Sequence, residues 1–213
     1  MRRFSFIAAS VCCAFFACAP RYGMRVPDEL VARLPYETRI ELLEAENELA
    51  VAIDKRDEAE NDVLRARDGL RRAKARLSAA EDEVDRAEDP KSKEIAHLAV
   101  EEAESRVTYL RARQEVNVAR LDLMQLQLRC AMARFELARL EAARKAKVEG
   151  AEDLSLETFQ NQVKDCEAEV AERQKELQKD QEAAAAEAKA VWDTKKAALA
   201  KKTFDTRASP FVE

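Results

Sequence analysis

Two rows of apolar residues repeat every seven positions along the first half of the chain. One row is made entirely of alanine, and the other, three positions earlier, is mainly leucine and valine. The alanine row consists of Ala45, Ala52, Ala59, Ala66, Ala73, Ala80 and Ala87. The larger row consists of Leu42, Leu49, Arg56, Val63, Leu70, Leu77 and Val84. This spacing predicts a coiled-coil helix that its partner can approach closely over the alanines.

Two interruptions divide the periodic region into three predicted helices. Pro90 ends the first, because proline inside a helix removes a hydrogen bond and clashes with the preceding turn. Gly150 supplies the usual residue just past a helix C-terminus, and Ser155 is a suitable N-cap for the next helix. The sequence therefore predicts an all-α fold: an elongated antiparallel coiled coil of helices over about 36–88, 92–149 and 156–202.

The second predicted helix carries two apolar seams of different length, which indicate where its neighbours lie. The seam expected to face the first helix spans the whole helix and consists of Ala96, Val100, Ala103, Val107, Leu110, Gln114, Asn117, Leu121, Met124, Leu128, Ala131, Phe135, Ala138 and Ala142. The other is confined to the C-terminal half and consists of Val116, Ala119, Leu123, Leu126, Cys130, Ala133, Leu137 and Leu140. A helix with two apolar faces needs two partners. We therefore expect three packed helices near Gly150 and a mostly two-helix hairpin tip at Asp89, Pro90 and Lys91.

Three polar residues interrupt these seams and form a predicted polar core layer. Gln114 and Asn117 lie on the second helix, where buried polar groups can fix register or oligomeric state. Local hydration, or rotation of the helix toward its other partner, explains them equally well. Arg56 lies in the larger row of the first helix and should extend toward Asp122. A contact with a substrate or lipid is the alternative for Arg56.

Composition favours solvated helices over a nucleic-acid-binding or catalytic domain. Charged residues make up 37% of the chain, aromatic residues 6%, and the net charge is -5. A nucleic-acid-binding protein usually carries a basic excess, so no nucleic-acid partner is expected. His97 is the sole histidine and has no cysteine or second histidine at zinc-ligand spacing. We find no nucleophile, phosphate-binding or metal motif, and we expect no enzyme activity and no cofactor.

Cys130 and Cys166 both fall on apolar seams, and Trp192 lies in the alanine-rich end of the third predicted helix. A tight reversal at Gly150 would leave the two cysteines offset by about 10 Å, too far apart for a disulfide. Buried small side chains are therefore the favoured interpretation, with an intermolecular disulfide as the alternative. Trp192 is expected to cover the second helix, or otherwise to mark a contact surface.

The N-terminus has the pattern of an export signal. Met1 to Arg3 is basic, and an apolar run from Phe4 to Ala19 follows it. Ala17-Cys18 fits the end of the cleavage box in bacterial lipoproteins, and residues 1–18 resemble that class of signal peptide, although Phe15 and Phe16 depart from it. The resemblance implies lipidation of Cys18 and a chain facing the periplasm from the outer membrane. A secreted unlipidated chain, a signal anchor or a mitochondrial presequence are the alternatives.

The remaining segments are expected to lie outside the helical domain, which we place at 37–202. Residues 19–36 contain three prolines and predict an extended tether, with one helical turn near Asp28 to Arg33. Residues 203–213 lack periodicity and predict a flexible tail.

These features favour a non-enzymatic envelope lipoprotein that acts as a spacer, scaffold or adaptor through helix–helix contacts with protein partners. The helical hairpin is also similar to the tentacles of periplasmic holdase chaperones of the Skp family, but no strand pattern for that family's body is present. Residues 131–145 are rich in Ala, Leu and Arg, and in this composition they are similar to TolC-type helices and to the hairpins of membrane-fusion adaptors. These resemblances imply two alternatives, a periplasmic holdase or an accessory part of an efflux or secretion assembly. Self-association is left open.

Overall fold

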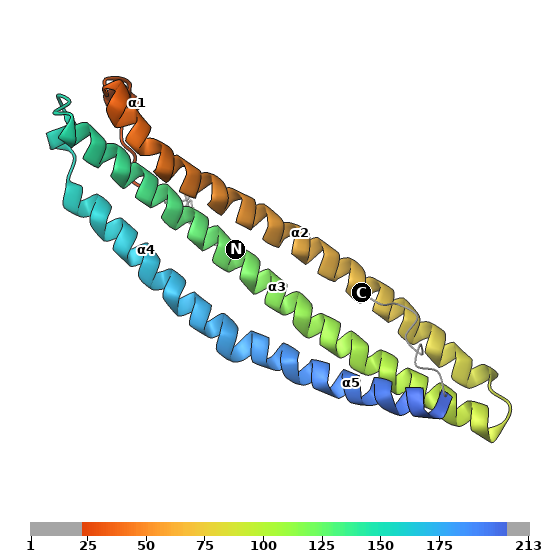
Figure 1. Cartoon of the computed structure of the whole chain (residues 1–213). Coiled ribbons are helices and arrows are strands. Elements are labelled where there is room, and N and C mark those ends of the chain that lie inside the picture. Colours follow the sequence, from red (N-terminus) through yellow and green to blue (C-terminus); the bar gives the residue numbers. More distant parts are fainter. Residues whose placement is uncertain (1–22, 204–213) are drawn as a thin grey trace, which may run out of the picture.

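A computed structural model describes residues 23–203, and over these residues the chain is helical and without strands (Figure 1). The elements, in chain order, are α1 (Asp28–Ala32), α2 (Tyr36–Arg86), α3 (Pro90–Lys145), the 3-10 turn η1 (Ala151–Asp153), α4 (Leu156–Glu176), the π-helical turn η2 (Leu177–Glu182) and α5 (Ala183–Thr203). The long helices pack side by side, which confirms the all-α class. The predicted signal peptide, with Cys18, and residues 204–213 lie outside the described residues.

Helix α2 follows the predicted heptad pattern. Both rows are buried or half-buried along the whole helix, with Ala59, Val63 and Ala73 among the best-covered residues. The helix begins after Pro35 and ends at Arg86, and the next residue, Ala87, has an extended backbone. The 51-residue α2 packs against α3 in antiparallel orientation, as Figure 1 shows.

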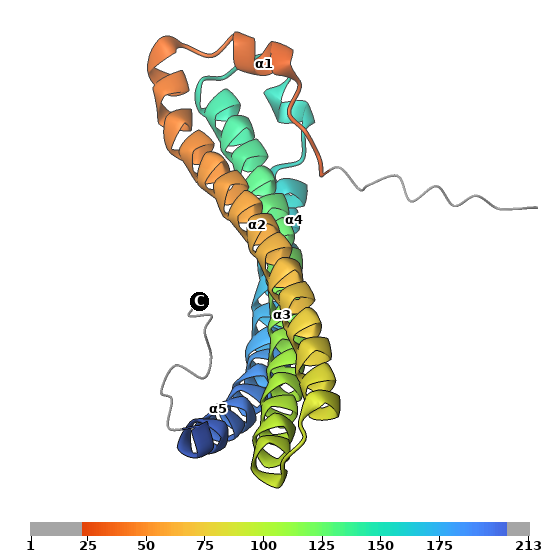
Figure 2. The ribbon, with the colours of Figure 1, turned by 90° about the vertical axis from the view of Figure 1, so that its right-hand side faces the viewer.

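Helix α3 lies between α2 and the third helical segment because its two seams occupy nearly opposite faces. Leu121 belongs to one seam and Leu123 to the other, and two residues turn about 200° around an α-helix. Helix α2 covers the first face, and α4, η2 and α5 cover the second. Packing of α2 against the third segment is at most marginal among the described residues, so the three long elements form an open layer (Figures 1 and 2).

The third segment follows α3 much farther than predicted. Ser155 caps α4 by accepting a hydrogen bond from the Thr158 amide. Beyond η2, α5 continues almost to the start of α3, where Lys202 Nζ lies 2.6 Å from Glu94 Oε1. The expected long two-helix tip is therefore reduced to the last turns next to Pro90. The second seam continues toward the N-terminus of α3 through half-buried Ile95, Leu98, Tyr109 and Ala112 and buried Glu102.

The predicted tether is also ordered against the helices from residue 24 onward. The expected helical turn is present as α1, but Val26, Leu30 and Leu34 are buried. They join a core with Leu42, Leu140, Ala143, Val148, Ala151 and Phe159. We call this end of the molecule, where residues 24–34 cover α3 and α4, the closed end.

The connection between α3 and α4 is longer than a reversal at Gly150. Helix α3 already ends at Lys145, and Lys147 adopts a left-handed backbone with a φ of 53°. Gly150 has a φ of 89°, which disfavours any residue with a side chain, and it precedes η1. Arg144 Nη2 donates to the carbonyl oxygen of Leu154 at 2.6 Å and holds the connection over the end of α3.

Candidate functional site

The predicted polar layer is brought together only in part. Asn117 Nδ2 donates to the backbone oxygen of Asp62 on α2 at 3.3 Å, so this side chain does link the two helices. Gln114 is half-buried on the same seam. Arg56, however, pairs within its own helix, with Asp57 at 2.9 Å and Glu60 at 3.8 Å, and the expected contact with Asp122 is wrong. The neighbouring acids on α2 are nearer than Asp122, which is exposed on the other helix.

The hairpin tip is a capped turn with exposed side chains. Asp89 Oδ1 accepts hydrogen bonds from the amides of Lys91 and Ser92, both at 2.9 Å, and Pro90 occupies the first turn of α3. Hydrogen bonds from the Ser92 hydroxyl and amide lower the pKa of the Asp89 carboxyl, because they favour its charged form. Asp89, Pro90 and Lys91 are all exposed, so the tip is available for contact.

A buried polar cluster joins all three long elements in the half of the molecule next to the tip. Trp192 Nε1 of α5 donates to Glu102 Oε1 of α3 at 2.8 Å. Glu102 is only 1% exposed, and its Oε2 lies 3.8 Å from Arg76 Nη2 of α2. A buried carboxylate is costly unless it is paired, so these contacts favour a single alignment of the three helices.

Aromatic and cationic groups complete this cluster. The Trp192 ring stacks on Tyr109 with 5.3 Å between centroids and 13° between planes. Arg106 and Lys196 each lie 5.4 Å from the Trp192 ring centroid, within cation–π range. The predicted packing of Trp192 over this helix is confirmed. Glu102 is not among the apolar seam residues identified from the sequence, so its burial beneath Trp192 was not predicted.

The closed end holds a second buried charge cluster, which fixes the N-terminal segment. Arg139 of α3 is 8% exposed and pairs with Glu136, with 3.0 Å between Nη1 and Oε1, and with Asp28 of α1. Glu136 Oε2 also accepts from the Val26 amide at 2.8 Å. Met24 donates through its amide to Gln162 Oε1 of α4 at 3.1 Å. The backbone amides of Met24 and Val26, in the segment predicted to be a tether, thus donate hydrogen bonds to side chains of α4 and α3.

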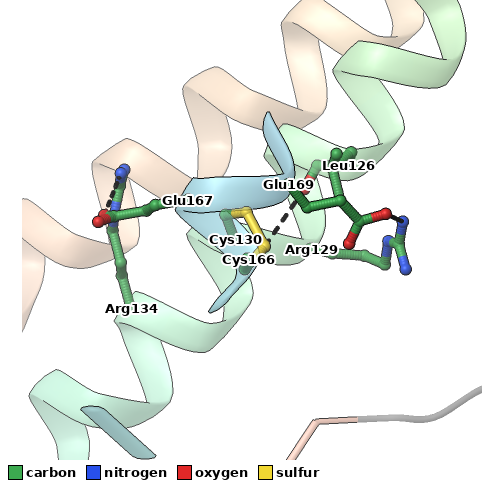
Figure 3. The surroundings of a disulfide bond; sticks show 7 residues. All are labelled: Leu126, Arg129, Cys130, Arg134, Cys166, Glu167 and Glu169. Carbon is green, nitrogen blue, oxygen red and sulfur yellow. Dashed lines mark hydrogen bonds and ion pairs between the residues drawn. A yellow bond between two sulfur atoms is a disulfide. The ribbon is translucent and has the colours of Figure 1, made fainter. Parts of the chain in front are cut away.

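Cys130 and Cys166 form a disulfide between α3 and α4 (Figure 3). Their Cα atoms are 5.6 Å apart, within the usual range for a disulfide, so the predicted 10 Å offset is wrong. The error arises from the long connection after α3, which shifts α4 along its partner. Ion pairs flank the bond on either side, Arg134 with Glu167 at 2.7 Å and Arg129 with Glu169 at 3.9 Å, as Figure 3 shows.

Residues 23–203 also bear on two other classes of site, metal centres and membrane spans. No group of three or more side chains suited to a metal ion occurs there, and His97 is exposed. None of the helices in this part of the chain combines the length and apolar character that a membrane span requires. Within the described residues, the candidate functional features are therefore the buried contacts between helices and the exposed helix surfaces.

Comparison with known proteins yields no relative: no protein-family model matches the chain, and no characterised protein or solved structure is detectably similar to it.

Proposed function

We propose that the chain is a non-enzymatic coiled-coil scaffold of the cell envelope, anchored through a lipid on Cys18 and engaging protein partners along its helices. The observation that carries the proposal is the Cys130–Cys166 disulfide. Disulfides persist in oxidising compartments outside the cytosol. The predicted export signal in residues 1–18 supports the same kind of compartment on independent grounds.

The anchoring geometry supports a spacer. Met24 is fixed on the closed end, and the five residues between it and Cys18 can span at most about 17 Å when fully extended. The 56 residues of α3 extend for about 84 Å. An anchored molecule standing upright would therefore hold Asp89, Pro90 and Lys91 roughly 80 Å from the membrane.

The contacts between the helices support the coiled-coil assignment. Seven repeats of the two heptad rows in α2 lie against the seam of α3, and their alanines allow close packing. The buried Glu102 and Arg139 clusters fix the alignment of the third segment and of the N-terminal segment. Such a rigid, laterally exposed surface suits an adaptor that positions other proteins.

The test is intact mass spectrometry of the mature chain purified from native membranes. We expect a chain that begins at Cys18 and carries acyl groups. Cys18→Ser should abolish the acylated form and release the protein from the membrane fraction. Cys12→Ser is the matched control and should leave both unchanged. An unmodified N-terminus beyond residue 18 would contradict the anchor and favour the holdase alternative.

A further inference from the structure

The first third of α2 carries a second apolar row besides the two that pack against α3. We call this row the outer stripe, and it consists of Tyr36, Ile40, Leu43, Ala50 and Val51. Leu43 belongs to the outer stripe and Ala45 to the row packed against α3, and two residues turn about 200° around an α-helix. The outer stripe therefore lies on the outward side of α2, along one edge of the layer of helices (Figure 1).

Exposed apolar side chains are concentrated in and beside the outer stripe. Ten large apolar side chains are exposed in the described part of the chain, and five of them lie within residues 36–53. Tyr36 is 74% exposed, Leu43 56% and Ile40 47%. The other five stand singly along the chain: Met24, Leu64, Val118, Met132 and Val191. A helix with two apolar faces needs two partners, and among the described elements only α3 packs extensively on α2.

Negative charge surrounds the outer stripe. Residues 36–54 contain six acidic side chains and one cationic side chain, so this segment alone carries as much net charge as the whole chain, which has -5. Glu37 and Glu44 lie on one side of the stripe and Glu46 on the other, at the positions that flank a heptad seam. Among the six acidic residues, only Glu41 forms an ion pair within the described part of the chain, at 2.7 Å from a lysine of α3. Five carboxylates thus have no cationic partner there.

Arg39, the one cationic residue in this segment, binds backbone oxygens instead of the neighbouring carboxylates. Its Nε donates to the carbonyl oxygen of Leu34 at 3.0 Å, and its Nη2 donates to that of Ala32. Both bonds hold the guanidinium against the end of α1. The outer stripe therefore presents an exposed apolar centre with unpaired carboxylates on either side.

We propose that the outer stripe binds a basic amphipathic helix of a partner protein, packed lengthwise on α2 as a short coiled coil. The apolar residues of such a helix, at heptad spacing, would cover the stripe. Residues that flank a coiled-coil seam set the choice of partner through their charges, so lysine or arginine is expected opposite Glu44 and Glu46. The inference rests on the proposed scaffold function, since it names the surface and the chemistry of the partner that the scaffold would hold.

The stripe also defines the length and register of the partner helix. Asp54 ends the apolar row, so the contact extends over residues 36–53, or about 27 Å of helix. Asn47 interrupts the row near its middle, and a polar residue in a coiled-coil seam fixes register. A polar residue of the partner is therefore expected opposite Asn47.

A second copy of the chain and a lipid surface fit the outer stripe less well. A second copy could offer only its own outer stripe, because the other exposed large apolar side chains in residues 23–203 stand singly. Two such stripes packed together would place the unpaired carboxylates of one copy beside those of the other, and like charges across an interface suppress association. Helices that lie in a lipid surface carry lysine and arginine beside their apolar face, whereas this helix carries glutamate there.

The experiment is photo-cross-linking of the full-length chain in its native cells, with the photoreactive residue in place of Leu43. Asn61 is the matched control, because it is also exposed and lies five full turns farther along α2, on the same side but beyond the apolar row. We expect position 43, and not position 61, to capture a segment of another protein. Mass spectrometry should identify that segment as a heptad helix with lysine or arginine beside its apolar row.

Charge reversal gives the second arm. Glu44→Lys with Glu46→Lys should reduce the adduct, and the affinity for the captured segment made as a synthetic peptide, by about tenfold or more. Glu81→Lys with Glu83→Lys makes the same change, at the same spacing, on exposed residues of α2 far from the outer stripe, and should have little effect. Circular dichroism of both variants verifies that the helices remain folded.

An adduct with a lipid, with a second copy of the chain or with a segment that is not basic would overturn the proposal. Equal capture at position 61, no adduct at position 43, or an affinity that survives the reversal at Glu44 and Glu46 would do the same. Membrane fractionation of the same cells distinguishes this failure from failure of the anchor. An adduct formed by an unanchored chain supports the outer stripe alone, whereas an anchored chain without the adduct retains only the envelope assignment.

Discussion

At the scale of single residues, two buried charges organise the molecule. Arg139 binds the N-terminal segment to α3, and Glu102 connects Trp192 of α5 with Arg76 of α2. Glu102 lies on the continuation of the second seam of α3, where an apolar residue would satisfy the heptad pattern equally well. An apolar side chain would tolerate sliding of the neighbouring helix, whereas a buried charge with fixed partners does not.

Glu102→Ala should lower the free energy of unfolding by about 3 kcal/mol, because it removes the hydrogen-bond acceptor of the Trp192 indole and the charge partner of the partly buried Arg76. The chain contains one tryptophan, so its fluorescence reports directly on α5. We expect a red-shifted emission in the variant, measured together with chemical denaturation. Glu104→Ala, at an exposed position of the same helix, should change neither quantity. An unshifted spectrum in Glu102→Ala would show that the carboxylate does not hold the tryptophan.

At the scale of the elements, the disulfide closes a loop that contains the end of α3, the connection and the start of α4. The bonded cysteines are 36 residues apart in sequence. Replacing both by serine should reduce stability by about 4 kcal/mol through the greater freedom of the unfolded chain. Denaturation with and without reductant measures this loss. The doubly substituted protein is the control, since reductant should not affect it.

Thiol labelling gives the independent check on the bond. In the unreduced native protein, Cys130 and Cys166 should resist alkylation, and electrophoresis without reductant should show no cross-linked dimer through them. Ready alkylation of both thiols would contradict the bond described here.

The sequence predicted the elements much better than their alignment. The ends of α2 and α3 fall within a few residues of Pro90 and Gly150, and the rows of α2 are covered as expected. The third segment follows α3 farther than predicted because its apolar row continues past Leu177 with a shift of one residue. Leu177 and Ala185 both join the core around Val116, eight positions apart instead of seven, and the π turn η2 absorbs the additional residue.

The candidate site was predictable to a smaller extent. Periodicity identifies Asn117 and the exposed tip, but the Cys130–Cys166 bond depends on the length and path of residues 146–155, which no repeat encodes. The burial of Val26, Leu30 and Leu34 was likewise missed. Their spacing of four residues is a helical apolar pattern, and the nearby prolines led to the interpretation of an extended tether.

At the scale of the whole molecule, the open layer predicts an elongated monomer. Small-angle scattering should give a radius of gyration of about 25 Å, as expected for a rod the length of α3. A compact chain of this size would give about 17 Å. A value near the compact one would show that the helices fold back on themselves. A much larger value that falls on dilution would show association of copies instead.

The central position of α3 also decides how the molecule can come apart. Since α2 and the third segment each rest on α3 and hardly on one another, either can detach while the other pair stays intact. The Cys130–Cys166 bond keeps the third segment covalently attached to α3 at one point. The part of the third segment between this bond and the hairpin tip, which includes Trp192, can separate from α3 and rebind in the same register. The part near the closed end stays attached to α3. Within the third segment, therefore, only the part between the disulfide and the hairpin tip can separate from α3.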